Sequence, residues 1–134
     1  MPNQYNHNSH CKYLLKVHIV LAIKYRKKLL KGSLNDDILQ LIFDISKGQK
    51  WTIDTIQSDV DHLHILVDYE PTISVFDIVH RIKQLSTYRI YRKYNDFLKQ
   101  YFWKENTLWS DGYFACSTGD VSTEIVAKYI ATQG

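Results

Sequence analysis

The sequence predicts an α+β fold of the ferredoxin-like, or RRM-like, split βαβ type. In this fold an antiparallel sheet carries helices on one face, and here a further helix follows at the C-terminal end. Strand-like apolar runs and helical apolar periodicities occur in the order strand, helix, strand, strand, helix, strand, helix. A length of 134 residues, 45% of them hydrophobic, suits one domain with a substantial core. Without a linker or an internal repeat, residues 11–134 are expected to form a single domain.

The first half of the chain is predicted to form an arm, a strand, a helix and a hairpin. Residues 1–10 are polar and are expected to be a flexible N-terminal arm. Residues 13–25 are rich in Leu, Val, Ile and Tyr, with lysines where an alternating strand turns them outward. Apolar residues recur at helical spacing over 34–47. Two extended runs, 51–56 and 63–69, follow, and two adjacent strands in a hairpin are their simplest arrangement.

The second half is predicted to add two helices, one strand and a short helical piece. Pro71 ends the hairpin, and apolar residues at three- and four-residue intervals over 73–88 indicate a helix whose exposed side is basic. A short helical piece at 95–101 leads to a last strand within 108–117. The final helix is expected over 121–133.

Composition narrows the functional classes. Cys11 and Cys116 have no paired spacing, which argues against a disulfide framework or a cysteine zinc site and favours a reducing, cytoplasmic setting. The apolar run 13–23 has about half the ~20 residues of a membrane span, and Lys16 and His18 interrupt it, so no membrane association is expected. A net charge of +3 permits nucleic-acid binding without demanding it.

Two histidines form the sharpest local feature. His62 and His64 flank Leu63 in a predicted strand, and residues two apart in a strand project from the same face. Two neutral imidazoles side by side make half of a metal site. The alternative is two partly buried histidines that serve sheet packing.

The final helix carries a second pair. Tyr129 and Gln133 are four residues apart, so a phenol and an amide oxygen project from one helical face and can reach the same site. Taken alone the pair also fits a packing tyrosine followed by a solvated amide.

Several motifs in order resemble the single-tyrosine HUH transposases of small insertion sequences, the IS200-like family. The resemblance runs from about residue 13 to residue 133. Besides the basic helix after Pro71, its motifs are KYR at 24–26, DHLHILV at 61–67, LWSDGYF at 108–114 and STEIVAKYIATQ at 122–133.

The resemblance implies a DNA transposase that cleaves and rejoins single-stranded DNA at the ends of an insertion sequence. It implies that His62, His64 and Gln133 bind one divalent ion, Mg²⁺ with Mn²⁺ as a plausible substitute. Tyr129 on the catalytic C-terminal helix would be the nucleophile, forming a 5′-phosphotyrosine intermediate. Relatives recognise subterminal DNA hairpins and work as homodimers in which the tyrosine helix of one subunit completes the metal site of the other.

Basic side chains are further candidates, in this case for contact with DNA phosphates. Each basic candidate for DNA phosphate contact has the alternative of a solvated surface position. We interpret Asp54, Asp61 and Asp68 as surface charges of the hairpin. The basic candidates are Lys24, Arg26, Lys27, Arg81, Lys83, Arg89 and Arg92.

Three rival functions remain open. A non-catalytic RNA- or single-stranded-DNA-binding module shares the fold order, but the chain lacks the aromatic signature of RNA recognition motifs, and such a module has no reason to pair two histidines on one strand. A phosphoesterase with two HxS or HxT motifs is disfavoured because a single HxH occurs. Replication-initiating HUH nickases ordinarily need a longer chain.

Overall fold

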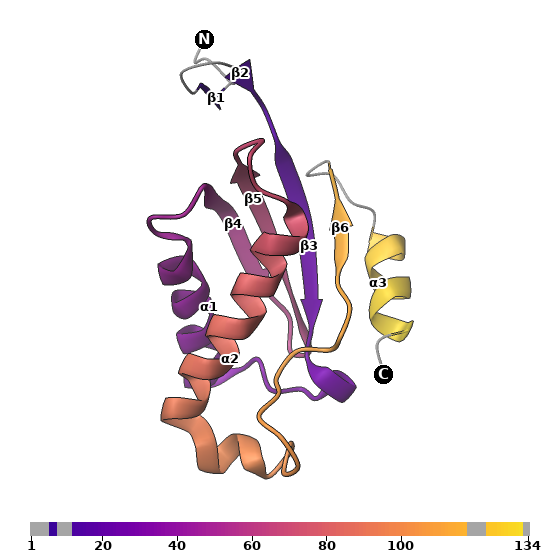
Figure 1. Cartoon of the computed structure of the whole chain (residues 1–134). Coiled ribbons are helices and arrows are strands. Elements are labelled where there is room, and N and C mark those ends of the chain that lie inside the picture. Colours follow the sequence, from indigo (N-terminus) through magenta and orange to yellow (C-terminus); the bar gives the residue numbers. More distant parts are fainter. Residues whose placement is uncertain (1–5, 8–11, 118–122, 133–134) are drawn as a thin grey trace.

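The computed structural model describes residues 6–7, 12–117 and 123–132 (Figure 1). Its main sheet has four antiparallel strands in the order β4-β5-β3-β6, and a small two-stranded sheet pairs β1 with β2. The α+β split fold predicted from the sequence is confirmed. The strands are β1 Asn6–His7, β2 Lys12–Tyr13, β3 Lys16–Ala22, β4 Trp51–Ser58, β5 His62–Tyr69 and β6 Phe114–Cys116, and the helices are α1 Gly32–Ser46, α2 Val75–Lys99 and α3 Thr123–Thr132.

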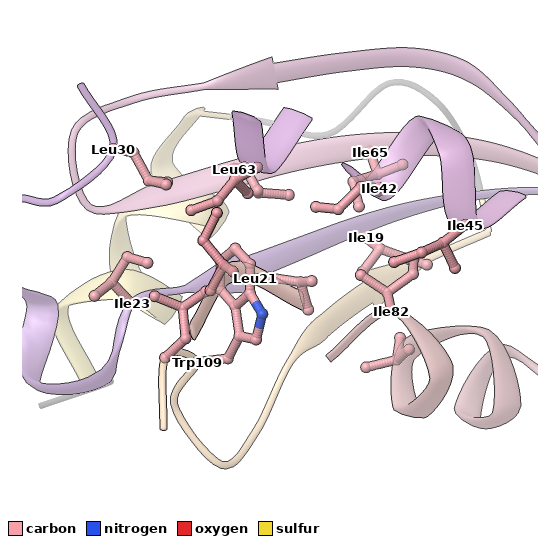
Figure 2. Close-up of a cluster of buried hydrophobic side chains, with 14 of the residues drawn as sticks. Ile19, Leu21, Ile23, Leu30, Ile42, Ile45, Leu63, Ile65, Ile82 and Trp109 are labelled. Atoms are coloured by element: carbon pink, nitrogen blue, oxygen red, sulfur yellow. The ribbon is translucent and has the colours of Figure 1, made fainter. Parts of the chain in front are cut away.

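One face of the sheet forms the core with α1 and α2. Alternate residues of β3 and β5 point to this face, and each apolar side chain fully buried there contributes roughly 1.5–3 kcal/mol. Figure 2 shows these side chains meeting residues of both helices and Trp109. The labelled members are Ile19, Leu21, Ile23, Leu30, Ile42, Ile45, Leu63, Ile65, Ile82 and Trp109.

Strand alternation sends the intervening residues to the opposite face, which α1 and α2 do not cover. The register aligns Val20 with His64 on one side and with Phe114 on the other. Aligned residues of antiparallel strands project from the same face. This face, called the open face below, therefore carries the two predicted histidines.

Two strands, β3 and β6, are shorter than the segments predicted for them, 13–25 and 108–117. β3 ends at Ala22, and Lys24–Arg26 form a short 3-10 turn. Within it Tyr25 and Arg26 adopt left-handed backbone angles, with φ of 59° and 51°, which end the extended run. Within the predicted strand 108–117, regular pairing is limited to β6, and Trp109 makes an isolated bridge to Ile23.

Helix α2 is longer than predicted. The Ser74 side chain caps its start by accepting a hydrogen bond from the backbone nitrogen of Asp77 at 3.0 Å. The short helical piece expected at 95–101 is not separate, because the helix continues to Lys99 across a kink at Tyr94, where φ is −118° and ψ is 27°.

The ends of the chain flank the sheet. Helix α3 lies beside β6, at the edge opposite α1 (Figure 1). Of the predicted final helix 121–133, residues 121, 122 and 133 lie outside the described residues. Within the predicted arm, Asn6–His7 pairs with Lys12–Tyr13. No helix in the described ranges is long and apolar enough to cross a membrane.

Candidate metal and tyrosine site on the open face

The two predicted histidines lie together on β5. The ring centroids of His62 and His64 are 5.0 Å apart and the rings are steeply inclined to one another. Between them, Leu63 is fully buried in the core. The alternation of a regular strand thus produces the arrangement that the HxH spacing predicts.

Each of these imidazoles has a partner that the sequence analysis did not assign. The Nδ1 atom of His62 donates a hydrogen bond to Asp61 at 2.8 Å, and the Nδ1 atom of His64 is 3.0 Å from the Nε2 atom of His18. Asp61, interpreted as a surface charge, therefore orients a histidine instead. Both contacts leave the Nε2 atoms of His62 and His64 free of these hydrogen bonds, which is the arrangement that metal-binding histidines use.

Burial favours the neutral form of two imidazoles here, those of His64 and His18. It lowers the pKa of His64, and the neighbouring His62 and His18 lower it further because like charges repel. The pKa of His18 is also lowered by burial. Neutral rings are the form that binds a metal ion.

A hollow opens beside His64 and His18. It has a volume of about 240 Å³ and is partly polar, since Gln57 is aligned with His64 across the β4–β5 pair and presents an amide there. The hollow gives a substrate access to the imidazoles from the open face. Its lining residues are His18, Thr55, Gln57, His64 and Leu66.

Tyr129 lies over the other side of the same face. Its ring centroid is 6.0 Å from that of Phe114, which is aligned with Val20 and, one strand further, with His64. Phe114 and His64 thus stand two strand spacings apart, about 10 Å. The fold brings the predicted nucleophile and the histidines to one face, with β3 between them.

The phenol of Tyr129 is poorly provided with polar contacts. Its oxygen is buried and has no hydrogen-bond partner among the described residues. Ser110, a neighbouring polar side chain, directs its hydroxyl to the carbonyl oxygen of Ala22 at 3.3 Å. Burial raises the pKa of Tyr129, and Ser110 only partly opposes the rise.

A metal site cannot be completed from the described residues alone. Among them, no three His, Cys, Asp or Glu side chains are grouped to hold an ion. The predicted third ligand, Gln133, lies outside the described residues. The site therefore consists of two oriented imidazoles and a tyrosine approaching from β6.

The predicted DNA-binding residues divide into engaged and exposed groups. The Lys83 ammonium donates to the carbonyl oxygens of Ser110, Asp111 and Gly112 at 2.7, 3.1 and 2.8 Å, so its hydrogens are used within the chain. Lys24 forms an ion pair with Asp111 at 3.2 Å. The exposed members are Arg26, Lys27, Arg81, Arg89 and Arg92.

The hairpin carboxylates other than Asp61 behave as surface charges. Asp54 and Asp68 both pair with Lys16, at 3.2 and 2.8 Å. Exposed pairs of this kind contribute about 1 kcal/mol or less. They lie toward the end of β5 away from His62 and take no part in the site.

Comparison with known proteins identifies relatives over nearly the whole chain. Residues 11–133 match the family model described as "Transposase IS200 like". The ISDra2 transposase TnpA of Deinococcus radiodurans is 28% identical over 121 residues, which cover 90% of this chain and 85% of that protein. The transposase for insertion sequence element IS200 of Salmonella typhimurium is 25% identical, with 93% and 80% covered.

Two solved structures share the fold. A crystal structure from Deinococcus radiodurans described as a transposase matches with a TM-score of 0.86 and 23% identity, covering 96% of this chain and 97% of that one. A REP-associated tyrosine transposase bound to a REP hairpin matches with a TM-score of 0.57 and 9% identity, covering 95% and 70%.

Proposed function

We propose, since this chain belongs to the IS200-like transposase family, that it cleaves and rejoins single-stranded DNA at insertion-sequence ends. In this proposal Tyr129 is the nucleophile, and His62, His64 and Gln133 hold a divalent ion. The observation that carries the proposal is that the phenol and both imidazoles occupy one face of the sheet, across β3.

The donor set of this chain fits a divalent ion. Asp61 holds His62 with its Nε2 lone pair available, and His18 can do the same for His64 by accepting from its Nδ1. Nitrogen donors suit Mn²⁺ better than the harder Mg²⁺, whereas an amide oxygen from Gln133 suits both. We therefore expect Mg²⁺ to support activity and Mn²⁺ to replace it.

In the proposed reaction the Tyr129 phenol attacks the scissile phosphate of the DNA. A bound ion would act as a Lewis acid that stabilises negative charge on the scissile phosphate. The Tyr129 oxygen attacks phosphorus and loses its proton, while the bond from phosphorus to the 3′ oxygen breaks and that oxygen gains a proton. The products are a 5′-phosphotyrosine and a free 3′ hydroxyl. Attack by another 3′ hydroxyl on this linkage reseals DNA and releases the tyrosine.

We propose hairpin recognition and a homodimer as further parts of the function. A structural neighbour is bound to a REP hairpin, and exposed Arg26, Lys27, Arg81, Arg89 and Arg92 are suited to contact phosphates here. Helix α3 lies at a sheet edge rather than between other elements. Such a helix can complete the site of a second subunit without rearranging the core.

Covalent trapping tests the proposal. The protein is incubated with Mg²⁺ and single-stranded oligonucleotides that carry hairpins and the element's ends, and is then analysed by denaturing electrophoresis. We expect a protein–DNA adduct from the natural chain and none from Tyr129→Phe, because the variant lacks the attacking oxygen. Hairpin binding should survive this substitution.

Tyr88→Phe is the matched control, since Tyr88 is exposed on α2 and removing its hydroxyl should leave the adduct unchanged. An adduct that persists in Tyr129→Phe would assign the nucleophile elsewhere. Metal-independent binding without any adduct from the natural chain would favour the rival, a non-catalytic RNA- or single-stranded-DNA-binding module.

A further inference from the structure

The turn that follows β3 is strained. Tyr25 and Arg26 both have left-handed backbone angles, a conformation that costs a residue with a side chain roughly 1–2 kcal/mol. Two such residues in succession are maintained only where the surrounding structure holds them. In this turn the Tyr25 side chain faces solvent, with 58% of the residue exposed.

An aromatic groove lies beside this turn. It has a volume of about 210 Å³, and one wall is formed by the Tyr25 ring, whose centroid is 6.4 Å from that of Phe102. Trp103, which lines the same groove, is 72% exposed and so offers a large unpartnered ring. The remaining lining residues are Tyr101, Lys104, Glu105 and Thr107.

The groove is next to the histidine end of the sheet. The backbone nitrogen of Ile23 donates to the carbonyl oxygen of Asp61 at 2.8 Å, and that of Lys24 donates to Leu108 at 2.8 Å. The turn bearing Tyr25 is therefore tied to the residue that precedes His62. A DNA strand that reached the imidazoles from this end of the sheet would lie beside the turn that bears Tyr25.

The charges around the groove are positive apart from that of Glu105, and they favour a polyanion. Arg26, Lys27 and Lys28 are exposed immediately after Tyr25, and Lys104 lines the groove itself. The Lys24 ammonium lies 5.7 Å from the centre of the Tyr25 ring. Aromatic faces interleaved with cations are the combination that proteins use to hold single-stranded nucleic acid.

We propose that this groove binds one unpaired base of the DNA strand, stacked against Trp103 and Tyr25. The inference rests on the proposed function, since it takes single-stranded DNA as the substrate. A base in a duplex is stacked and paired and is not free to enter, so the groove distinguishes single strands from duplexes. It also holds the strand at a point beside the imidazoles.

Binding of oligothymidylate tests the inference in the Tyr129→Phe background, which leaves DNA uncut. Removal of one base–aromatic stack weakens binding by about five-fold to a hundred-fold. We expect a loss in this range for Trp103→Ala, and also for Tyr25→Gly, which removes the ring and relieves the left-handed strain. Affinity for a blunt duplex should not change.

The control variant is Phe43→Ala, which removes an exposed ring from α1 and should bind oligothymidylate normally. Trp103→Phe keeps an aromatic face and should retain most of the affinity. Thermal unfolding followed by circular dichroism verifies that each variant is folded. If folded Trp103→Ala and Tyr25→Gly both bind as tightly as the parent, the groove does not hold a base.

Fluorescence gives an independent readout. Trp51 and Trp109 are buried, so Trp103 is the accessible indole. Oligothymidylate should protect it from quenching by acrylamide, and Trp103→Phe should abolish the protected signal. If the natural chain forms the adduct but Trp103 is not protected, this inference is wrong and the proposed function stands. If Trp103 is protected but no adduct forms, the groove binds a base and the proposed cleavage function is wrong.

Discussion

The two halves of the candidate site are built in different ways. The histidine half rests on the continuous β3–β5 ladder, where seven aligned pairs run from Lys16 with Asp68 to Ala22 with His62. The tyrosine half rests on the irregular segment that precedes β6, on the three-residue strand β6 and on α3. One half is part of the sheet, and the other is docked against its edge.

This difference indicates a division of roles. Side chains on a central ladder keep their relative positions because any shift in register would also misplace the core residues on the other face. A helix at a sheet edge can move without that penalty. In the proposed function, the imidazoles are therefore suited to hold an ion in place, and Tyr129 is suited to approach the DNA and to move with it once linked.

The largest expected effect concerns the ladder half. His18→Phe removes the nitrogen next to His64 while keeping a ring of similar shape, and Asp61→Asn weakens the acceptor for His62. Each should lower Mn²⁺ affinity, measured by calorimetry on the DNA-free protein, by about 10- to 100-fold, because the histidine rings lose their orienting partners.

The matched control is Thr55→Val, which changes the same hollow without touching an imidazole nitrogen. It should bind Mn²⁺ as the natural chain does. If His18→Phe binds Mn²⁺ with unchanged affinity, the contact between His18 and His64 is a packing contact, and the ladder does not preorganise the ion site.

A smaller effect is expected in the loop that supports the tyrosine half. Lys83→Met removes the ammonium shared by the carbonyl oxygens of Ser110, Asp111 and Gly112. Loss of this donor should lower the free energy of unfolding, measured in urea, by about 1–2 kcal/mol, since the partly buried acceptors are left without it. Burial already lowers the pKa of Lys83, in keeping with an internal role.

The salt dependence of hairpin binding separates this role from phosphate contact. A lysine that contacts phosphate contributes about one to the slope of log affinity against log salt. Lys83→Met should leave that slope unchanged, whereas Arg89→Met, at an exposed position of α2, should reduce it by about one. A reduced slope in Lys83→Met would restore Lys83 to the DNA-binding set.

Local periodicity was sufficient for the parts of the site that lie within one element. The HxH spacing determines that His62 and His64 share a face, whichever strand lies beside them. His18 could not be found in this way, because its contact with His64 spans 46 residues and depends on the β3–β5 register. The available signal was that His18 lies two residues after Lys16, on the outward face of the predicted strand.

Two differences between the predicted and the observed structure, at Lys83 and in the last strand, share a physical cause. Lys83 was predicted on the exposed side of its helix as a candidate for DNA contact, but a loop that follows α2 folds back over it and accepts hydrogen bonds from its ammonium. The strand expected over 108–117 is shorter than predicted. Trp109 makes only an isolated bridge to Ile23, and the backbone nitrogen of Ser110 donates to the carbonyl oxygen of Ala22, before regular pairing begins at β6. Both outcomes depend on the path of an irregular loop, which periodicity does not describe.

Apart from the loss of the adduct, the smallest expected effect is on stability and concerns the Tyr129 hydroxyl. Its oxygen is buried without a hydrogen-bond partner among the described residues, an arrangement that opposes docking of α3. Tyr129→Phe removes the unpaired group and keeps the ring against Phe114. We therefore expect it to abolish the adduct and yet to stabilise α3 docking by up to about 1 kcal/mol, measured by hydrogen exchange of the α3 amides.

The direction of this change distinguishes a nucleophile from a packing residue. A tyrosine retained for stability would use its hydroxyl in a hydrogen bond, and its loss would weaken the fold. Ser110→Ala provides the comparison, because the Ser110 hydroxyl neighbours Tyr129 and already bonds to the carbonyl oxygen of Ala22. Faster exchange in Tyr129→Phe would mean that the phenol has a partner in solution, and the tyrosine half would then be fixed as firmly as the histidine half.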